Sequence, residues 1–212
     1  MELRTDLPLK CLETPANTDQ RGVVVLLHGL GATVDDLVSL VDELRFPARF
    51  VLLEAPHAVA MGEHYQGYAW YQRQGEQLVG LDESIRLIRE SLNRLDVDAA
   101  RTVVGGFSQG AATALSVVLA AEQTPAGLAM LSGYVARPQV LDARRERIQD
   151  LYLLLCHGIH DDVVPFGDGL RALDLLAARG ARGRLVAFPT SHWIPGEAVV
   201  ELRRFLDERL KG

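Results

Sequence analysis

Six short, mostly apolar runs recur along the chain, and each ends close to a glycine, a proline or a polar residue. The runs cover residues 23–28, 49–54, 102–107, 127–132, 151–156 and 183–188. Apolar runs of this length, bounded in this way, are typical of strands that are covered on both faces of a sheet. The pattern therefore predicts the six main strands of a central sheet.

Helical periodicity fills most of the intervals between these runs. Residues 111–121 are apolar on nearly every side, which predicts a buried helix. Elsewhere apolar residues return on one helix face, and the last of these helices opens with Pro195 near its first turn. The three faces are Leu37, Leu40, Val41 and Leu44; Ile85, Ile88, Leu92 and Leu95; and Val199, Leu202, Leu206 and Leu210. Alternating strands and helices predict an α/β fold, with a mostly parallel central sheet and helices on both faces.

Two stretches fit this alternation less well. Residues 2–12 are expected to add an edge strand, and residues 62–76, rich in glycine and aromatic residues, are expected to form a long loop. Loops of this length in compact domains are often functional. We expect this loop to overhang the functional site, with Trp70 or Tyr71 lining a pocket; the alternative is that these rings pack the loop onto the sheet. No insertion between strands is long enough for a separate lid domain, which predicts an open, shallow site.

The composition is that of an ordinary globular protein. The chain has 212 residues, of which 48% are hydrophobic and 24% charged, and we expect residues 1–212 to form a single domain. The net charge of −6 predicts no basic surface for nucleic acid or for anionic membranes. Whether the protein is a monomer or a homodimer stays open.

The two cysteines and the first residues of the chain indicate the compartment in which the protein is expected. Cys11 and Cys156 are too few for a disulfide framework, and Cys156 lies in a predicted core strand, so we expect a reduced, buried thiol. The chain starts without the basic and apolar segments of a signal peptide, and it has no apolar run long enough to span a bilayer. We therefore expect a cytoplasmic protein with no stable membrane insertion.

Residues 106–110 read Gly-Phe-Ser-Gln-Gly and lie between a predicted strand and a predicted helix. Strand, tight turn and helix are the context in which this G-x-S-x-G pattern forms a nucleophile elbow. The serine, Ser108, then adopts a strained backbone conformation, and glycines two residues away on either side prevent collisions. The alternative is a glycine-rich strand end with an incidental serine.

A nucleophilic serine needs a base, and in hydrolases built on this elbow the order along the chain is Ser, then Asp or Glu, then His. Three histidines precede the serine: His28, His57 and His64. His157 and His160 lie before the best candidate acids, so the order selects His192. His192 follows the run 183–188 and therefore lies at the carboxyl end of a predicted strand, where open α/β sheets place their sites.

The acid is expected in the loop after the run 151–156, where Asp161 and Asp162 are both available. Spacing does not separate them, because a one-residue change in the turn exchanges which carboxylate faces inward. The residues alone favour Asp161 only slightly, and one of the two is expected to be a turn or helix-cap aspartate.

The first of the six apolar runs leads into His28-Gly29-Leu30-Gly31, where the glycines allow a turn that aims a backbone N–H at the elbow. The N–H groups of Leu30 and Gln109 are then expected to form an oxyanion hole, and His28 is expected to be a turn residue bonded to the backbone.

Further wall residues are expected beside the acid and the base. Trp193 follows the predicted base, and Val163, Val164 and Phe166 follow the predicted acid. The remaining histidines and acids show no metal-ligand spacing, so we expect no metal and no cofactor.

With these pieces placed, the chain resembles the phospholipase/carboxylesterase family, which includes the acyl-protein thioesterases. The resemblance spans roughly residues 22–211, and its most specific parts are Phe107 and Gln109 beside the serine and an H-G-x-x-D-x-x-V-P pattern at residues 157–165. The matching stretches are Leu26–Gly31, Gly105–Gly110, Leu131–Tyr134, His157–Pro165 and the late His192. The resemblance implies an α/β-hydrolase fold and places the acid on Asp161.

The resemblance also implies an activity. It implies a serine carboxylesterase that hydrolyses small or single-chain acyl esters through an acyl-enzyme intermediate, with an acyl-thioesterase or a lysophospholipase as alternatives. This chain departs from the family pattern at Gln72, where Asp is usual, and at Trp193, where a small or polar residue is common. A third possibility is a hydrolase-fold ligand-binding protein without catalysis, which should lack at least one of the four catalytic elements.

Overall fold

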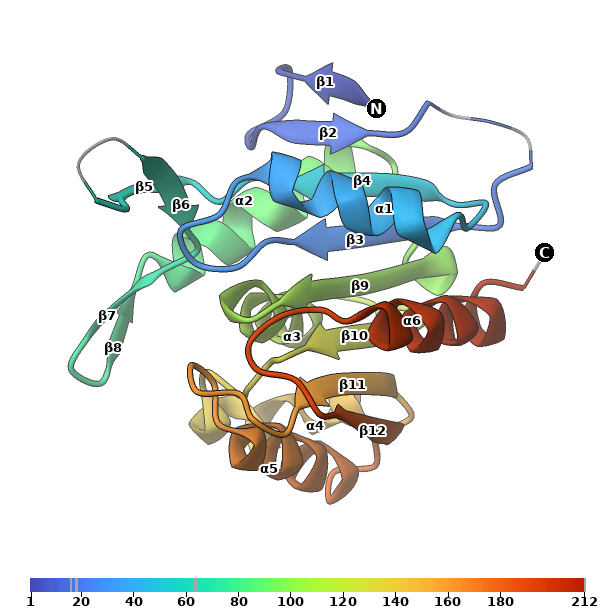
Figure 1. Cartoon of the computed structure of the whole chain (residues 1–212). Helices are drawn as coiled ribbons and strands as arrows, with labels where there is room; N and C mark the ends of the chain where they lie inside the picture. The colour runs from blue at the N-terminus through green and yellow to red at the C-terminus, as the bar shows by residue number, and fades with distance from the viewer. Residues whose placement is uncertain (16, 18, 63–64, 212) are drawn as a thin grey trace.

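The computed structural model describes residues 1–15, 17, 19–62 and 65–211. Its centre is an eight-stranded sheet with the strand order β1-β2-β4-β3-β9-β10-β11-β12 (Figure 1). The strands are β1 (Glu2–Arg4), β2 (Cys11–Glu13), β3 (Val23–Leu27), β4 (Arg49–Leu53), β9 (Thr102–Phe107), β10 (Gly127–Leu131), β11 (Tyr152–Gly158) and β12 (Arg182–Phe188).

The six strands predicted from the apolar runs are confirmed: five of them are mostly buried, and β12, at the edge of the sheet, is partly exposed. Strands β4, β3, β9, β10, β11 and β12 are parallel to one another, and the register sets Leu26 of β3 opposite Gly105 of β9. The edge strand expected within residues 2–12 is two short strands: β2 pairs antiparallel with β4, and β1 pairs antiparallel with β2.

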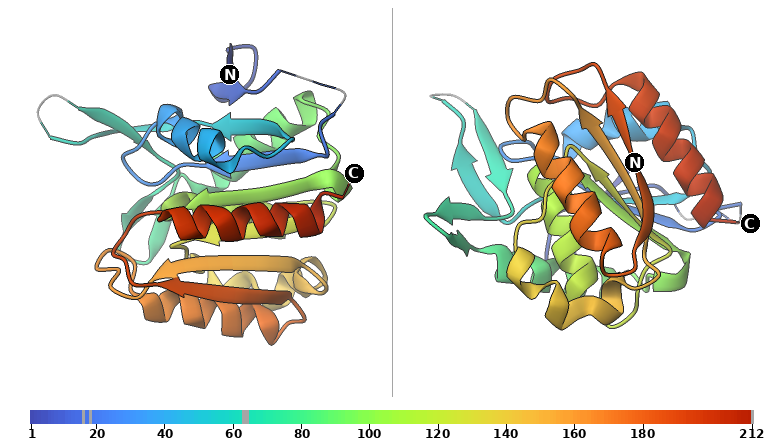
Figure 2. Two further views of the ribbon diagram at one scale, coloured as in Figure 1. Left: turned by 45° about the vertical axis from the view of Figure 1, so that its right-hand side comes forward. Right: turned by 90° about the horizontal axis from the view of Figure 1, so that it is seen from below.

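Helices cover both faces of the sheet, as expected (Figure 2). One face packs against α1 (Val38–Leu44) and α6 (Gly196–Arg209). The other face packs against α2 (Leu81–Arg94), α3 (Gln109–Ala120), α4 (Arg145–Ile148) and α5 (Phe166–Ala177). Single 3₁₀ turns lie at Val34–Leu37, Ala99–Arg101, Pro138–Val140 and Asp142–Arg144.

The predicted apolar faces lie in the two cores. Leu40 and Leu44 of α1 and Leu202 and Leu206 of α6 pack in one core, and Ile88 of α2 packs in the other. The two cysteines are buried and unpaired, and burial raises the pKa of the Cys11 and Cys156 thiols to about 12.

The prediction of a long loop over residues 62–76 is wrong. Strand β5 (His57–Ala60) pairs with β6 (Gln66–Ala69), and β7 (Gln72–Gln74) pairs with β8 (Gln77–Val79). Residues 63 and 64, between β5 and β6, lie outside the described residues. Figure 1 shows both hairpins beyond the carboxyl ends of β3 and β9.

The physical reason is that backbone pairing forms these strands, with no need for a regular apolar alternation. The backbone of Tyr68 exchanges hydrogen bonds with the turn after β3, from Gly31 N to Tyr68 O at 2.8 Å and from Tyr68 N to Ala32 O at 3.0 Å. In the second hairpin, Gly75 occupies the tight turn with φ +60°, a conformation that favours glycine.

The turn between β9 and α3 packs against the end of β3 with backbone on backbone. A Cβ atom added at Gly106 would lie 2.6 Å from the carbonyl carbon of Gly110 and 2.7 Å from the carbonyl oxygen of Leu27. A Cβ atom at Gly110 would overlap the carbonyl oxygens of Leu27 and His28. Since backbone atoms cannot rotate away, only glycine fits at these two positions.

We expect Gly110→Ala to lower the free energy of unfolding by about 3 kcal/mol, because the added methyl group forces α3 away from β3. Gly196→Ala in α6 is the matched control, since a Cβ atom there would meet nothing within 4 Å. The control should raise stability by about 0.5 kcal/mol through the unfolded state. Urea unfolding followed by circular dichroism measures both variants; equal effects would contradict the proposed close contact.

Candidate active site

Three loops at the carboxyl edge of the sheet bring together the three side chains predicted to act as nucleophile, acid and base. Ser108 follows β9, Asp161 follows β11 and His192 follows β12. Nε2 of His192 lies 2.9 Å from Oγ of Ser108, and its Nδ1 lies 2.7 Å from Oδ2 of Asp161. Because carboxylate oxygens only accept, Nδ1 carries the proton and Nε2 accepts the hydrogen bond from the serine hydroxyl.

Ser108 has the backbone strain expected of a nucleophile elbow. Its φ is +55° and its ψ is −120°, values that cost a non-glycine residue about 1–3 kcal/mol. Hydrogen bonds hold this conformation: Ser108 N donates to Leu131 O at 2.8 Å, and Ser108 O accepts from Ala111 N at 3.0 Å. The strained turn directs the hydroxyl toward His192 and away from the helix.

Asp161 is buried and fully bonded. Its Oδ1 accepts from the backbone N–H groups of Val163 at 3.0 Å and Val164 at 2.8 Å, while Oδ2 faces His192. Burial acts to raise the pKa of Asp161, but the hydrogen bonds from His192 and the two amides outweigh burial and hold this pKa below its usual value. The carboxylate therefore stays ionised beside the imidazole.

The structure places Asp161, and not its neighbour Asp162, against His192. Asp162 is exposed, and its Oδ1 accepts a hydrogen bond from Oγ of Ser191 at 2.8 Å. The two adjacent carboxylates point in different directions because the turn that binds the first to two amides turns the second toward solvent.

A second histidine, His157, lies beside the buried carboxylate. Its side chain is fully buried, and Nε2 lies 2.9 Å from Val164 O and 3.5 Å from Oδ2 of Asp161. The chain order excludes His157 as the base, because it lies before the acid. The signal for its position is the H-G-x-x-D pattern, which sets it at the end of β11, four residues before the acid.

The two residues predicted to supply oxyanion amides lie beside the serine. Leu30 and Gln109 line the same cavity as Ser108. Gln109 is the first residue of α3, and N–H groups in the first turn of a helix have no intrahelical acceptor.

His28 fixes the turn that carries Leu30. Its Nδ1 donates to Gly29 O at 2.7 Å, and its Nε2 accepts from Ala55 N at 3.0 Å. Burial lowers the pKa of His28, in keeping with this neutral, doubly bonded ring. The expectation of a turn histidine bonded to the backbone is confirmed.

The side chain of Gln109 makes two buried hydrogen bonds that the sequence did not predict. Its Oε1 accepts from Trp70 N at 2.8 Å, and its Nε2 donates to Tyr71 O at 2.9 Å. Trp70 in turn donates from its indole Nε1 to His28 O at 2.8 Å. These bonds fix the segment between the two hairpins to the elbow and to the turn after β3.

The pocket prediction for Trp70 and Tyr71 is wrong. Trp70 is 0% exposed and Tyr71 is 2% exposed, and neither lines the cavity beside Ser108. The alternative interpretation, that these rings pack the segment onto the sheet, describes their position. The Tyr71 hydroxyl is hydrogen-bonded to the hydroxyl of Tyr134, and Tyr134 is the ring that reaches the cavity.

The cavity beside Ser108 has a volume of about 450 Å³. Its lining residues are Gly29, Leu30, Arg73, Phe107, Ser108, Gln109, Tyr134, Val163, Val164, Asp168 and His192. Val164 is in the wall as predicted, and Phe107 packs its ring 4.7 Å from that of His192. Trp193 is not in the wall: it is 56% exposed and lies by a separate small crevice with Pro195.

Five lining residues were absent from the predicted site: Gly29, Arg73, Phe107, Tyr134 and Asp168. Tyr134 stands in one of the matching family stretches, so its signal was present in the sequence. Arg73 and Asp168 carried no signal, because only the folding of β7 and of α5 brings them to the serine.

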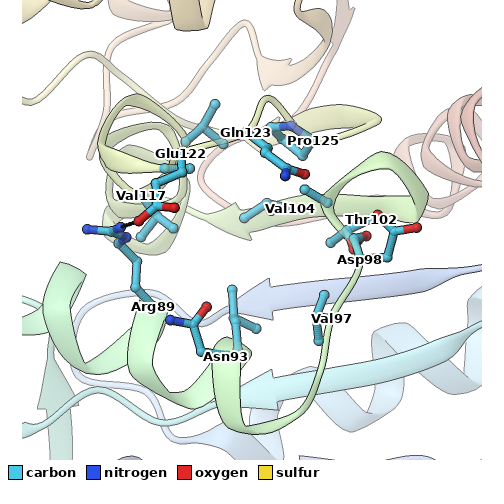
Figure 3. Close-up of a pocket in the computed structure, with 14 residues that line it drawn as sticks. Arg89, Asn93, Val97, Asp98, Thr102, Val104, Val117, Glu122, Gln123 and Pro125 are labelled. Atoms are coloured by element: carbon cyan, nitrogen blue, oxygen red, sulfur yellow. Dashed lines mark hydrogen bonds and ion pairs between the residues drawn. The ribbon is translucent and has the colours of Figure 1, made fainter.

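A second cavity of about 300 Å³ lies between α2 and α3 and is distinct from the site (Figure 3). Its floor includes Thr102, the first residue of β9, whereas Ser108 follows the last residue of that strand. A strand of this length separates the two places by about 20 Å. Arg89 and Glu122 at its rim form an ion pair with N and O 3.4 Å apart.

Across the described ranges, the helices include none that is long and apolar enough to cross a membrane. In the same part of the chain, no three histidine, cysteine, aspartate or glutamate side chains gather as a metal-binding group.

Comparison with known proteins agrees with this architecture. The sequence model of the family described as Phospholipase/Carboxylesterase matches residues 12–210. Acyl-protein thioesterase 1 of Yarrowia lipolytica is 30% identical over 186 residues, covering 80% of this chain and 82% of the relative.

Two solved structures share the fold. The crystal structure of esterase PE8 superposes with a TM-score of 0.81 at 31% identity, covering 95% of this chain and 99% of PE8. That of Zea mays acyl-protein thioesterase 2 gives a TM-score of 0.78 at 26% identity, covering 94% of this chain and 98% of the maize protein.

The sheet order, the helical layers and the strained turn after β9 define an α/β-hydrolase. The chain belongs to the phospholipase/carboxylesterase family, and it is a carboxylic ester hydrolase.

We expect Gln109→Met to lower the free energy of unfolding by about 2–3 kcal/mol. Methionine keeps the length of the side chain but leaves Trp70 N and Tyr71 O, both in buried residues, without partners. The exposed Gln77→Met is the matched control, which should change stability by less than about 0.5 kcal/mol. The urea midpoints of unfolding of the two variants are compared. Similar losses of stability would contradict the prediction, because they would show that the buried hydrogen bonds of Gln109 contribute no more than an exposed side chain.

Acid should remove the stability that Asp161 contributes. Its pKa in the folded protein lies below the usual 3.8, so its contribution is complete above that value and falls as the pH drops through the folded pKa. The stability of the native protein relative to Asp161→Asn should therefore decrease between pH 5 and pH 3. Chemical unfolding at a series of pH values measures this difference, and a constant difference would contradict the depressed pKa.

Proposed function

We propose that this chain is a serine carboxylesterase that hydrolyses small or single-chain acyl esters. The observation that carries the proposal is the continuous hydrogen-bond chain from Ser108 through His192 to Asp161, at 2.9 Å and 2.7 Å. A ligand-binding protein without catalysis has no need of a strained serine aligned with a base, which argues against the non-catalytic alternative.

In the proposed reaction, Oγ of Ser108 attacks the ester carbonyl carbon while Nε2 of His192 takes the hydroxyl proton. Asp161 holds the ring in its tautomer and stabilises the imidazolium that forms. The N–H groups of Leu30 and Gln109 bind the oxyanion of the tetrahedral intermediate, and each such donor contributes about 3 kcal/mol.

Collapse of the intermediate breaks the bond to the alcohol oxygen, which receives the proton from His192. Water then attacks the acyl-enzyme with His192 as general base, releasing the acid and restoring Ser108. Every step uses groups of the protein itself and water.

An acyl-thioesterase is the second candidate, and it is supported by the likeness to the acyl-protein thioesterases of Yarrowia lipolytica and Zea mays. The same residues would perform the reaction, with a thiolate as leaving group. The cytoplasmic location and the choice between monomer and homodimer stay predictions.

The test is hydrolysis of 4-nitrophenyl esters from acetate to palmitate, with acyl thioesters of the same chain lengths in parallel. Ser108→Ala should lose about 10⁶ in kcat. Asp161→Asn should lose about 10⁴, because the amide holds the wrong tautomer of His192.

Asp162→Asn is the matched control, and it should change kcat by less than about fivefold, since Asp162 is exposed and its carboxylate accepts a hydrogen bond from Ser191, away from His192. Equal losses in the two Asn variants would overturn the role of Asp161. A Ser108→Ala variant as active as the native protein would overturn the mechanism, and faster turnover of thioesters than of esters would select the thioesterase.

A further inference from the structure

One arginine in the wall of the cavity has no part in the proposed mechanism. Arg73 lies on β7, is exposed, and lines the cavity together with Ser108 and His192. It reaches the cavity because the β7–β8 hairpin follows directly on the segment that Gln109 fixes to the elbow. The backbone that carries Arg73 is therefore joined to the elbow through the hydrogen bonds of Gln109.

This guanidinium is free to bind an anion. Among the described residues, no carboxylate oxygen lies within 4.0 Å of a side-chain nitrogen of Arg73, whereas nearby Arg137 is paired with Asp82. Asp161, the acid nearest the reaction, is already bonded to His192 and to two amides. No internal ion pair would need to break when a substrate anion binds Arg73.

Arg73 also stands close in the chain to a tyrosine pair at the cavity. It follows Tyr71 by two residues, and its charge opposes the rise that burial gives to the pKa of the Tyr71 hydroxyl. That hydroxyl is bonded to Tyr134, which also lines the cavity. Arg73 and the Tyr134 phenol are therefore both part of the cavity wall.

The other charge in the wall lies apart from Arg73. Asp168 stands in the first turn of α5, and no ion pair joins it to Arg73. The cavity is thus positive on the hairpin side and negative on the α5 side. A substrate anion is attracted to the first side and repelled from the second, which fixes its orientation.

We propose that Arg73 selects esters that carry a carboxylate, which its guanidinium binds while Ser108 attacks the ester carbonyl. This inference rests on the proposed esterase function. The planar guanidinium can grip a carboxylate with two parallel hydrogen bonds, which gives both affinity and direction. A local cation is needed for such selection because the net charge of −6 otherwise disfavours anions.

Two matched pairs of substrates test the proposal and separate the two possible positions of the carboxylate. For the acyl side, mono-4-nitrophenyl adipate is compared with its neutral amide analogue, 4-nitrophenyl 5-carbamoylpentanoate. For the alcohol side, the butanoate ester of 4-hydroxybenzoate is compared with that of 4-hydroxybenzamide. The readout is the ratio of kcat/KM for the anionic ester to that for the neutral ester.

In at least one pair, Arg73→Gln should lower this ratio about tenfold, as expected for loss of a charged, bidentate hydrogen bond. Arg73→Lys should restore part of the ratio, because it keeps the charge but not the planar fork. Asp168→Asn should raise the ratio by removing the opposing charge. Raising NaCl from 50 mM to 500 mM should lower the ratio of the native protein, since an exposed cation is screened by salt.

Arg203→Gln is the matched control, because this exposed arginine of α6 has the same charge and is not among the residues lining the cavity. It should leave the ratio unchanged. If Arg73→Gln and Arg203→Gln change the ratio equally, or if Arg73→Gln leaves both ratios unchanged, the proposal for Arg73 is overturned. If the native protein hydrolyses the 4-nitrophenyl acetate-to-palmitate series but none of these four esters, the proposal for Arg73 is overturned; if it hydrolyses neither set, the proposed function itself fails.

Discussion

The close contact between the turn after β9 and the carboxyl end of β3 is the constraint on which the rest of the site depends. Glycines at 106 and 110 let backbone meet backbone there, since a Cβ atom at either position would collide with the carbonyl oxygen of Leu27. This contact sets Ser108 beside the turn that carries Leu30. It also explains why the strained serine is tolerated: the surrounding backbone leaves it no other conformation.

Hydrogen bonds from buried side chains extend this contact outward to the hairpins. Gln109 bonds the backbone on both sides of the peptide link between Trp70 and Tyr71, and the Trp70 indole bonds His28 O. The hairpin that bears Arg73 is thus joined to the elbow through buried polar groups, which are costly to separate. The β7–β8 hairpin, which contributes Arg73 to the cavity wall, is therefore connected by hydrogen bonds to the turn that carries Ser108.

The charges of the site depend on where the backbone turns. Asp161 and Asp162 are neighbours in the chain, yet one is buried against two amides and His192, and the other is exposed. The family pattern pointed to Asp161, but the residues alone could not separate the two. The backbone of the loop decides, because it offers two N–H groups to only one of the carboxylates.

The sequence by itself determined the six parallel strands, the apolar helix faces and the chain order of serine, acid and histidine, since periodicity and spacing are local properties. It did not determine the two hairpins, whose backbone pairing leaves no apolar alternation to read. Nor did it determine the whole pocket: Trp70 was a candidate wall residue, yet it is fully buried, whereas Arg73 and Asp168, which were not predicted, are part of the wall. Only the tertiary structure decided these positions, because a cavity wall is assembled from distant segments whose approach no local pattern encodes.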